Sequence, residues 1–475
     1  MRKYSLHLVT ITFLIAGIAS CKKEAAIPEA NTNKPPVACA GQDQTISLPV
    51  NSLMLDGSCS YDVNKNISSY LWTKISGPSS FNIANANVVQ TQLTNLVEGI
   101  FLFQLRVTDA GGLFSKDTMR VIVKRGNDCY PNRSEVPVTL LPSGNLSMAR
   151  MYMAVASAGN KIVFAGGETN AGVSSTVDIF DVSSNTWSTT QLSEARSKIA
   201  AVVLGKKIYF GGGQTGQDEY SSRVDIYDTE TNTWTVNNLI LTYPTTLSGA
   251  AAGNKVVFYG YVGAFIYDAS TNNWSTFSDP IFTHIDPNFS DWLFGITATS
   301  IGNMLYFAGG AGEYSNSNIV TTYSAIRIFN TINGTWTYST LNKPNGYAAG
   351  IAVDNINYWA GGYTGSISSP GSTLILTEQV EIRNVITNES SMTCLFQPNA
   401  KFSAVQKNDN IVFFTGAGQL KNKFDIYNIN SKSWSIGVMD KTMEENTIIS
   451  VNNNIYVAGG KVDGVLSNQV YKLTF

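Results

Sequence analysis

The sequence predicts an all-β protein in which a β-sandwich is followed by a β-propeller. Short strand-like runs occupy residues 35–125 and are separated by turn residues such as Asp56-Gly57 and Gly111-Gly112, a pattern typical of a sandwich. From about residue 136 a four-strand pattern recurs at roughly 40–50-residue intervals, which indicates propeller blades. The chain is also poor in charge (14%) and contains 40 glycines, a balance that suits strands joined by tight turns.

Residues 1–20 predict a signal peptide that is removed from the mature protein. Arg2 and Lys3 supply a positive start, and Leu6–Ala16 is an apolar run too short to remain as a membrane-spanning helix. Ile18-Ala19-Ser20-Cys21 resembles a bacterial lipobox. This resemblance implies that Cys21 is the acylated first residue of an outer-membrane lipoprotein, held on the membrane by its acyl chains. The alternative is an ordinary signal peptide with an incidental cysteine.

Residues 21–34 are polar and unpatterned, and we expect a flexible tether. Lys22-Lys23-Glu24 partly resembles the surface-export signal of Bacteroidetes lipoproteins, which implies a place in the bacterial cell envelope with exposure at the surface. Loss of Arg2 and Lys3 takes the formal charge from −2 to −4. This mild balance argues against a nucleic-acid partner, which would need a basic patch.

The five cysteines allow two disulfides beside the anchor. Cys39 and Cys59 flank one predicted hairpin region and could pair in an oxidising compartment. The sequence leaves open whether Cys129 and Cys394 meet. No CxxC pair or Cys/His cluster occurs, and His284 is the single histidine left after the signal is removed, so we expect no metal and no cofactor.

The first domain is expected at residues 35–125. Its predicted strands are Gln44–Leu48, Ser52–Asp56, Ser69–Ile75, Val88–Leu93, Ile100–Thr108 and Lys116–Lys124. Leu55-Asp56-Gly57-Ser58, Tyr70-Leu71-Trp72-Thr73 and Val107-Thr108-Asp109 resemble a PKD domain, an Ig-like sandwich, and this resemblance implies a spacer or interaction module. Trp72 is interpreted as a core residue, and an exposed sugar-stacking tryptophan is the alternative.

After a linker at residues 126–134, the repeats fill residues 135–475. The clearest copy has an apolar strand at Ala200–Leu204, a second strand that ends in Gly211-Gly212-Gly213, an alternating strand at Arg223–Tyr227 and a fourth strand opened by Trp234. This pattern resembles the Kelch repeat, which implies a β-propeller with the tryptophan packed between blades.

Seven sets of the first three strands favour seven blades. Six is the alternative if the degenerate Val256–Trp274 or Ile356–Arg383 unit, the latter without the tryptophan, is not a blade. The chain ends before a fourth strand of the last set. We expect Glu135–Leu141 to supply it and to close the ring, which removes two open sheet edges.

The long loops join second to third strands, and at Ser278–Phe294 a fourth strand to the next first strand. In an up-and-down blade both loop classes emerge on one face, and long loops gathered on one face of a repeat array indicate a binding site. The candidate residues of this face are Arg150, Glu168, Arg196, Tyr220, His284, Trp292, Glu313, Tyr314, Tyr323 and Tyr363. Aromatic and carboxylate side chains suit recognition of a protein or a glycan.

The preferred function is therefore a non-enzymatic binding module. The Kelch resemblance places Arg150 and Arg196 at the mouth of the central channel, although each could equally be a structural arginine bonded to carbonyls. With Glu168 they keep open an alternative, a carbohydrate-active enzyme such as a sialic acid mutarotase. Galactose oxidase chemistry needs two histidines that the mature chain lacks, and no nucleophile elbow, P-loop or dinucleotide motif occurs.

Overall fold

In the computed structural model the chain forms two compact units, Met1–Gly126 and Asn127–Phe475. No α-helix occurs in the described part of the chain, and every named element is a β-strand, as the sequence predicts. The structure describes residues 32–47, 50–97, 99–124, 133–217, 219–239, 246–260, 263–280, 292–314, 319–367 and 374–475.

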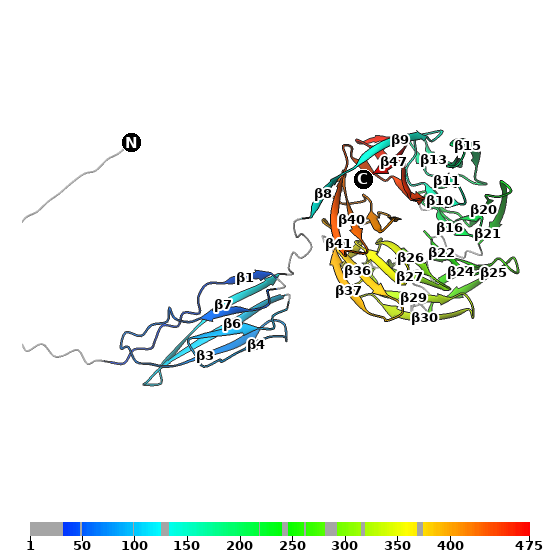
Figure 1. The fold of residues 1–475 in the computed structure, drawn as a ribbon. Helices are drawn as coiled ribbons and strands as arrows, with labels where there is room; N and C mark the ends of the chain where they lie inside the picture. The colour runs from blue at the N-terminus through cyan, green and yellow to red at the C-terminus, as the bar shows by residue number, and fades with distance from the viewer. Residues whose placement is uncertain are drawn as a thin grey trace, which may run out of the picture. The chain divides into compact units, whose positions relative to one another are not determined.

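The first unit is a sandwich of two sheets, with strand orders β1-β7-β6-β3 and β2-β5-β4 (Figure 1). Its strands are β1 Gln44–Ser47, β2 Leu53–Asp56, β3 Ile67–Ser76, β4 Asn82–Ile83, β5 Gln90–Thr94, β6 Gly99–Asp109 and β7 Phe114–Lys124. Each of the six segments expected from the sequence coincides with a strand. The sequence did not indicate β4, which has two residues.

Alternation along β6 builds the core of the sandwich. Phe101, Phe103 and Leu105 are fully buried, whereas the residues between them lie on the outer face of the sheet. Trp72 on the neighbouring strand β3 is 2% exposed and packs in the same cluster. It is therefore a core residue, as interpreted from the sequence, and is not available to stack on a ligand.

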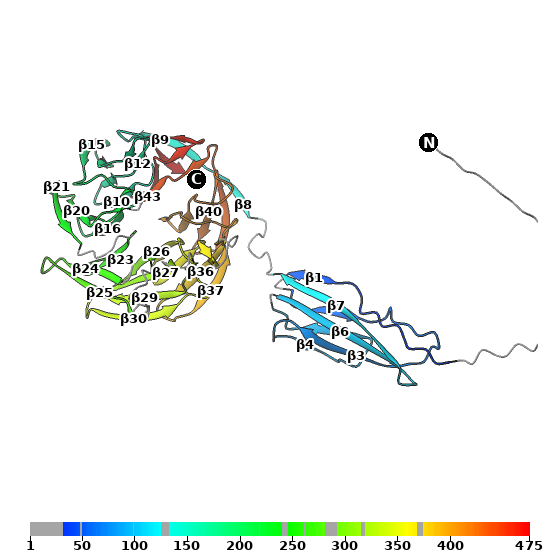
Figure 2. The ribbon, with the colours of Figure 1, turned by 180° about the vertical axis from the view of Figure 1, so that it is seen from behind.

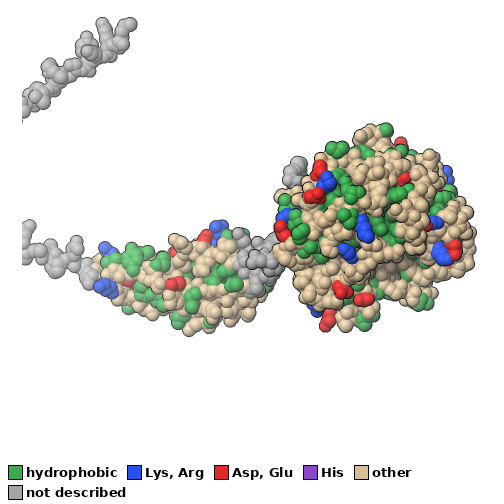
Figure 3. Space-filling model, turned by 45° about the horizontal axis from the view of Figure 1, so that its top comes forward, with side chains coloured by type: hydrophobic (Ala, Val, Ile, Leu, Met, Phe, Trp, Pro, Cys, Tyr) green, Lys and Arg blue, Asp and Glu red, His purple; other side chains and the backbone are tan. Residues whose placement is uncertain are grey.

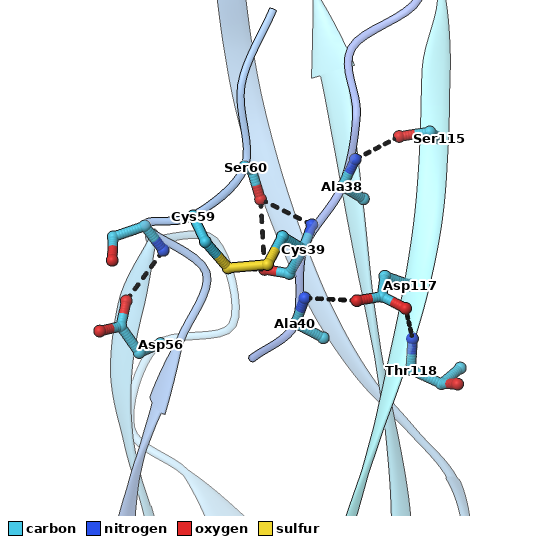
Figure 4. Close-up of a disulfide and its surroundings, with 10 residues drawn as sticks. Ala38, Cys39, Ala40, Asp56, Cys59, Ser60, Ser115, Asp117 and Thr118 are labelled. Carbon is cyan, nitrogen blue, oxygen red and sulfur yellow. Dashed lines mark hydrogen bonds between the residues drawn. A yellow bond between two sulfur atoms is a disulfide. The ribbon is translucent and has the colours of Figure 1, made fainter. Parts of the chain in front are cut away.

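A disulfide joins Cys39 and Cys59, whose Cα atoms are 5.4 Å apart (Figure 4). Next to it, the amide of Cys39 donates to Ser60 Oγ (3.0 Å) and the amide of Ala40 donates to Asp117 Oδ2 (2.7 Å). The segment that enters the sandwich is thus held by a covalent bond and by side chains. Of the other cysteines, Cys394 takes part in a disulfide, and Cys129 lies outside the described residues.

The described residues of the second unit contain seven sheets, each based on four antiparallel strands and placed around a ring (Figures 1 and 2). The first three sheets are β10 Ala154–Ala158, β11 Lys161–Ala165, β14 Thr176–Asp181 and β15 Thr186–Gln191; β16 Ala200–Leu204, β17 Lys207–Gly211, β20 Arg223–Asp228 and β21 Thr233–Asn238; and β22 Ser248–Ala252, β23 Lys255–Gly260, β24 Gly263–Asp268 and β25 Asn273–Ser278.

The remaining sheets continue the same order around the ring. They are β26 Trp292–Ile301, β27 Met304–Tyr314, β29 Ala325–Asn330 and β30 Thr335–Thr340; β31 Ala349–Val353, β32 Ile356–Ala360, β36 Gln379–Asn384 and β37 Ser390–Cys394; β38 Ala404–Lys407, β39 Asn410–Phe413, β40 Lys423–Asn428 and β41 Ser433–Val438; and β43 Thr447–Val451, β44 Asn454–Ala458, β47 Gln469–Thr474 and β9 Thr139–Asn145. Both degenerate units of the sequence form four-stranded sheets, the third and the fifth.

The last sheet takes its outer strand from the start of the unit. β9 pairs antiparallel with β47, so a strand that precedes the first sheet completes the seventh. The expected segment Glu135–Leu141 overlaps only the first part of β9. Its first residues instead belong to β8 (Ser134–Pro137), which pairs parallel with β41 on the sixth sheet. The start of the unit therefore covers two sheet edges.

Buried side chains form one cluster between each pair of consecutive sheets. Between the seventh and first sheets, Tyr456 and Val470 pack in one cluster with Phe164 and Phe180, and Trp187 lies against it. The Trp187 ring stacks on Phe180 with centroids 4.7 Å apart. The core of the second unit is thus a closed ring of inter-sheet clusters.

Backbone bridges bring the two long-loop classes together on one face. In three sheets, the residue just before the first strand pairs with the start of the second-to-third loop. These bridges are Met151 with Glu168, Ser197 with Gln214, and Gly346 with Tyr363. The second-to-third loops carry small hairpins of their own, such as β12 (Glu168–Thr169) with β13 (Gly172–Val173) and β18 (Gln214–Gly216) with β19 (Glu219–Tyr220).

Candidate functional site

A cavity of about 610 Å³ opens where the seven first strands begin, and we call it the mouth. Each sheet contributes a lining residue close to the start of its first strand, so the cavity lies on the axis of the ring. One residue from each sheet, in ring order, is Tyr152, Lys198, Thr246, Gly295, Tyr347, Lys401 and Glu445. Gln214 and Tyr220, from the second-to-third loop of the second sheet, add to the wall.

Most of these ring positions have a left-handed backbone. Five are non-glycine residues with φ between 52° and 58°, and Gly295 has φ 66°. The five are Tyr152, Lys198, Tyr347, Lys401 and Glu445. Left-handed φ is disfavoured for residues with a side chain and occurs freely for glycine. Such strain, repeated around one cavity, indicates that the side chains are kept for a role there.

The bend lets neighbouring ring positions bond to each other. The Lys198 amide donates to the Tyr152 carbonyl (3.1 Å), and the Lys401 amide donates to the Tyr347 carbonyl (3.0 Å). The Tyr347 amide donates to the Gly295 carbonyl (2.7 Å), where a Cβ on Gly295 would lie 2.7 Å from the Tyr347 ring. The rim of the mouth is therefore a rigid, hydrogen-bonded frame from which side chains project.

Aromatic rings form one wall of the mouth. The Tyr347 ring lies 5.7 Å from Phe294 and 6.2 Å, edge to face, from Tyr363. Burial raises the pKa of Tyr347 to about 12, and the neighbouring Tyr220 and Tyr363 add to the shift. The phenol of Tyr347 is therefore neutral and can act as a hydrogen-bond donor at physiological pH.

Lysines and carboxylates alternate around the rest of the rim. Lys198 Nζ lies 5.2 Å from the centre of the Tyr152 ring, 2.7 Å from Gln214 Oε1 and 3.9 Å from Glu168 Oε1. Burial, together with the charge and hydrogen bond of Glu445 and the charge of Glu168, raises the pKa of Tyr152 to about 12.

Lys401 occupies the opposite part of the rim. Its Nζ lies 5.1 Å from the Tyr347 ring centre. Lys401 is exposed and forms no ion pair with the described residues.

A shallow groove of about 740 Å³ continues from the mouth over the loops of the first and second sheets. Lys198 and Gln214 line both hollows, so they form one continuous surface. The groove is otherwise lined by small and uncharged polar residues and by Glu168, and it contains Thr169, Thr215 and Gln217. On the face drawn in Figure 3, charged side chains of the second unit are few and scattered.

Three residues predicted for the binding face lie at or beside these hollows. Glu168 lines the groove, where its Oε1 accepts a bond from Ser197 Oγ (2.8 Å). Tyr220 lines the mouth, and Tyr363 packs against Tyr347 at its wall. Tyr323 instead packs against the buried cluster between the third and fourth sheets.

The prediction that Arg150 and Arg196 belong to the binding face is wrong, because both side chains are 0% exposed. The Arg150 guanidinium donates to the Thr176 carbonyl (2.6 Å) and forms an ion pair with Asp178 (2.5 Å). Arg196 forms the equivalent pair with Asp225 and donates to two carbonyls. Both are structural arginines bonded to carbonyls, the second of the two readings that the sequence allowed.

The remaining candidates fall at the limits of what the structure describes. Cys21 and His284 lie outside the described residues. Trp292 begins β26 and pairs through its backbone with Glu313 near the end of β27, and Tyr314 follows.

The five left-handed rim residues were not predicted from the sequence. A positional signal exists, since four of them lie two residues before a first strand and Lys401 lies three before. Their residue types differ from sheet to sheet, however, and a repeat pattern based on residue identity does not detect them.

Two searches of the described residues gave negative results. No cluster of three histidine, cysteine, aspartate or glutamate side chains that could hold a metal ion occurs there. Within the same residues, no helix has the length and apolar character needed to cross a membrane.

Comparison with known families assigns parts of the chain. A family model for the PKD domain of KIAA0319-like proteins matches residues 40–123, and the Kelch motif matches residues 149–190 and 195–236. Both matches agree with the resemblances seen in the sequence and with the observed sandwich and ring of sheets.

Curated relatives share a limited region. Mouse dyslexia-associated protein KIAA0319-like protein is 39% identical over 109 residues, which cover 23% of this chain and 10% of that protein. Rat dyslexia-associated protein KIAA0319 homolog is 37% identical over 122 residues, 25% of this chain and 11% of that protein. Human low-density lipoprotein receptor-related protein 11 is 36% identical over 126 residues, 26% of this chain and 25% of that protein. The chain thus spans a quarter or less of these relatives.

Fold and matches together define a class of protein: an all-β chain with a PKD-like sandwich and Kelch repeats. Domains of both kinds commonly serve as interaction modules. The two matched families, and the mouth with its adjoining groove, are consistent with that class.

Proposed function

We propose that the chain is a lipid-anchored protein of the bacterial cell envelope that binds an external protein or glycan without transforming it. The binding site is the mouth of a seven-bladed propeller, and the PKD-like sandwich is a spacer between anchor and propeller. The observation that carries the proposal is the set of five left-handed, non-glycine residues around the mouth. Strained side chains around a cavity are typical of ligand-binding sites.

The enzymatic alternative has lost its support in the structure. A sialic acid mutarotase would use arginine and glutamate at the channel mouth, but Arg150 and Arg196 are buried and bonded to carbonyls. Glu168 alone remains at the surface, beside Lys198. Binding is therefore the function that the geometry supports best.

The anchor is tested by metabolic labelling of the expressed full chain with a tritiated fatty acid. We expect the label to be incorporated and the protein to fractionate with outer membranes, whereas Cys21→Ala loses both properties. A Cys21→Ala chain that remains labelled in the membrane would contradict the lipobox interpretation.

The binding site is tested on glycan and peptide arrays with a soluble Cys21→Ala chain that lacks the signal. We expect at least one ligand to bind, and its signal to be lost in the double variant Tyr152→Gly/Tyr347→Gly. Glycine suits the left-handed backbone, so the variant removes two walls of the mouth without new strain. The matched control is Asn388→Gly, another left-handed residue (φ 57°), in the third-to-fourth turn of the fifth sheet. Absence of any ligand that depends on the mouth would overturn the proposal.

A further inference from the structure

The charges of the mouth and groove balance. The two lysines, Lys198 and Lys401, face two carboxylates, Glu168 and Glu445. Glu168 lies 3.9 Å from Lys198, and Glu445 bonds to the phenol of Tyr152. A strongly anionic ligand is favoured by a surface with an excess of positive charge, which this site lacks.

The two hollows also differ in a way that fits one kind of ligand. The mouth offers the faces and edges of Tyr347, Tyr220 and Phe294, which pack against apolar surface and supply polar tips. The groove offers amide and hydroxyl groups, with Gln214 shared between the two. A ligand that fits both must carry C–H faces and many hydroxyl groups, and must be long enough to leave the mouth along the groove.

From this balance and this division we infer that the mouth and groove bind a neutral oligosaccharide several residues long. One ring packs against Tyr347 in the mouth, and the next rings extend over the β12–β13 and β18–β19 hairpins. Lys198, Gln214 and Glu168 are placed to bond to hydroxyl groups at the junction. This inference rests on the proposed binding function and names its ligand class.

Isothermal titration calorimetry on the soluble Cys21→Ala chain tests the inference. The neutral probes are maltohexaose, cellohexaose, xylohexaose and mannohexaose, and the anionic probes are hexagalacturonate and hexaglutamate. We expect a neutral probe to bind, Tyr347→Gly to weaken it about tenfold or more, and the Asn388→Gly control to leave it unchanged. Raising NaCl from about 0.05 M to about 0.5 M, and the variant Lys401→Gln, should each change the affinity less than about threefold.

The same titrations separate failure of this inference from failure of the proposed function. If only hexagalacturonate or hexaglutamate binds, in a manner that depends on Tyr347 and on salt, the mouth is a binding site but the ligand class is wrong. If none of the six probes binds while the arrays show a peptide that depends on the mouth, the oligosaccharide inference is overturned and the proposed function stands. If neither probes nor arrays show a ligand that depends on the mouth, both are overturned.

Discussion

At the scale of single residues, one position of the third strand carries a buried charge in five of the seven sheets. It lies opposite an aromatic residue of the second strand, and its occupants are Asp178, Asp225, Arg327, Glu381 and Asp425. The ionic partner comes from a different part of the chain in different sheets. In the fourth sheet the signs are reversed, with Arg327 on the strand and Asp279 before the first strand. In the sixth, Arg133 from the segment before β8 reaches Asp425. These pairs fasten the loops before the first strands, which carry the mouth, to the sheets.

Removal of one partner should therefore be costly. We expect Arg196→Met to lower the free energy of unfolding by about 3–5 kcal/mol, because Asp225 would remain charged and buried. The double variant Arg196→Met/Asp225→Leu should recover at least half of the loss, since no unpaired charge remains. Urea denaturation followed by tryptophan fluorescence measures both. A single variant as stable as the parent would show that the pair does not hold the loop.

The third-to-fourth turns begin with a side chain whose oxygen accepts a backbone amide two residues on. It is aspartate in the first three sheets and asparagine in the next three. The residues are Asp181, Asp228, Asp268, Asn330, Asn384 and Asn428.

The three aspartates make stability depend on pH. The pKa of each is lowered: at Asp181 chiefly by the Ser183 side chain, at Asp228 by the Thr231 amide and at Asp268 by Lys255. A carboxyl with a lower pKa in the folded state stabilises the protein above its unfolded pKa of about 4 and loses this as the pH falls through the folded pKa. We expect the urea midpoint to fall below about pH 4. The triple Asp→Asn variant, which keeps the turn bond without titrating, should show a shallower fall; an equal fall would contradict this origin.

At the scale of elements, the fifth sheet shows how a repeat tolerates loss of its most recognisable residue. Other sheets place a tryptophan of the fourth strand on an aromatic of the third, as Trp234 does on Tyr227 (4.8 Å). In the fifth sheet the corresponding pair is Ser390 with Arg383. The volume is supplied by Trp359 on the second strand, which is 1% exposed and packs against the fourth sheet.

This compensation predicts an unequal response to the same substitution. Trp359→Phe should lower the free energy of unfolding by about 1–3 kcal/mol, because it opens a void in the cluster between the fourth and fifth sheets. Trp274→Phe should cost less than about 1 kcal/mol, because Trp274 is only half-buried and its third-strand partner Tyr267 remains. Chemical denaturation of both variants makes the comparison, and equal losses would contradict the compensating role of Trp359.

The elements were largely predictable from the sequence, whereas the site was not. Strands such as β6 and β20 alternate buried and exposed residues with period two or carry recurring glycines, and these patterns are local. The depth of Arg150 depends on Asp178, 28 residues later on another strand, so the sequence left its role open. The mouth depends on the sign of φ at positions where tyrosine, lysine and glutamate alternate, and residue type does not reveal that sign.

At the scale of the whole molecule, each unit has its own core. The buried cluster of the sandwich contains residues of the first unit, whereas the seven inter-sheet clusters belong to the second. The second unit is closed when β9 pairs with β47, so its cooperativity depends on strands from both of its ends. The first unit depends on the disulfide between Cys39 and Cys59, which are 20 residues apart.

This separation predicts that loss of the disulfide acts on one unit alone. Cys39→Ala/Cys59→Ala should lower the free energy of unfolding of the sandwich by roughly 3 kcal/mol, because a loop of this length is no longer closed in the unfolded chain. Scanning calorimetry of the soluble chain should show two transitions in the parent and a shift of only the sandwich transition in the variant. Substitution is preferable to a reductant, because Cys394 is also disulfide-bonded. A matched Ser58→Ala variant, next to the bridge, should leave both transitions within about 2 °C of the parent. If both transitions shift together on loss of the bridge, the two cores unfold as one cooperative unit and the sandwich is more than a spacer.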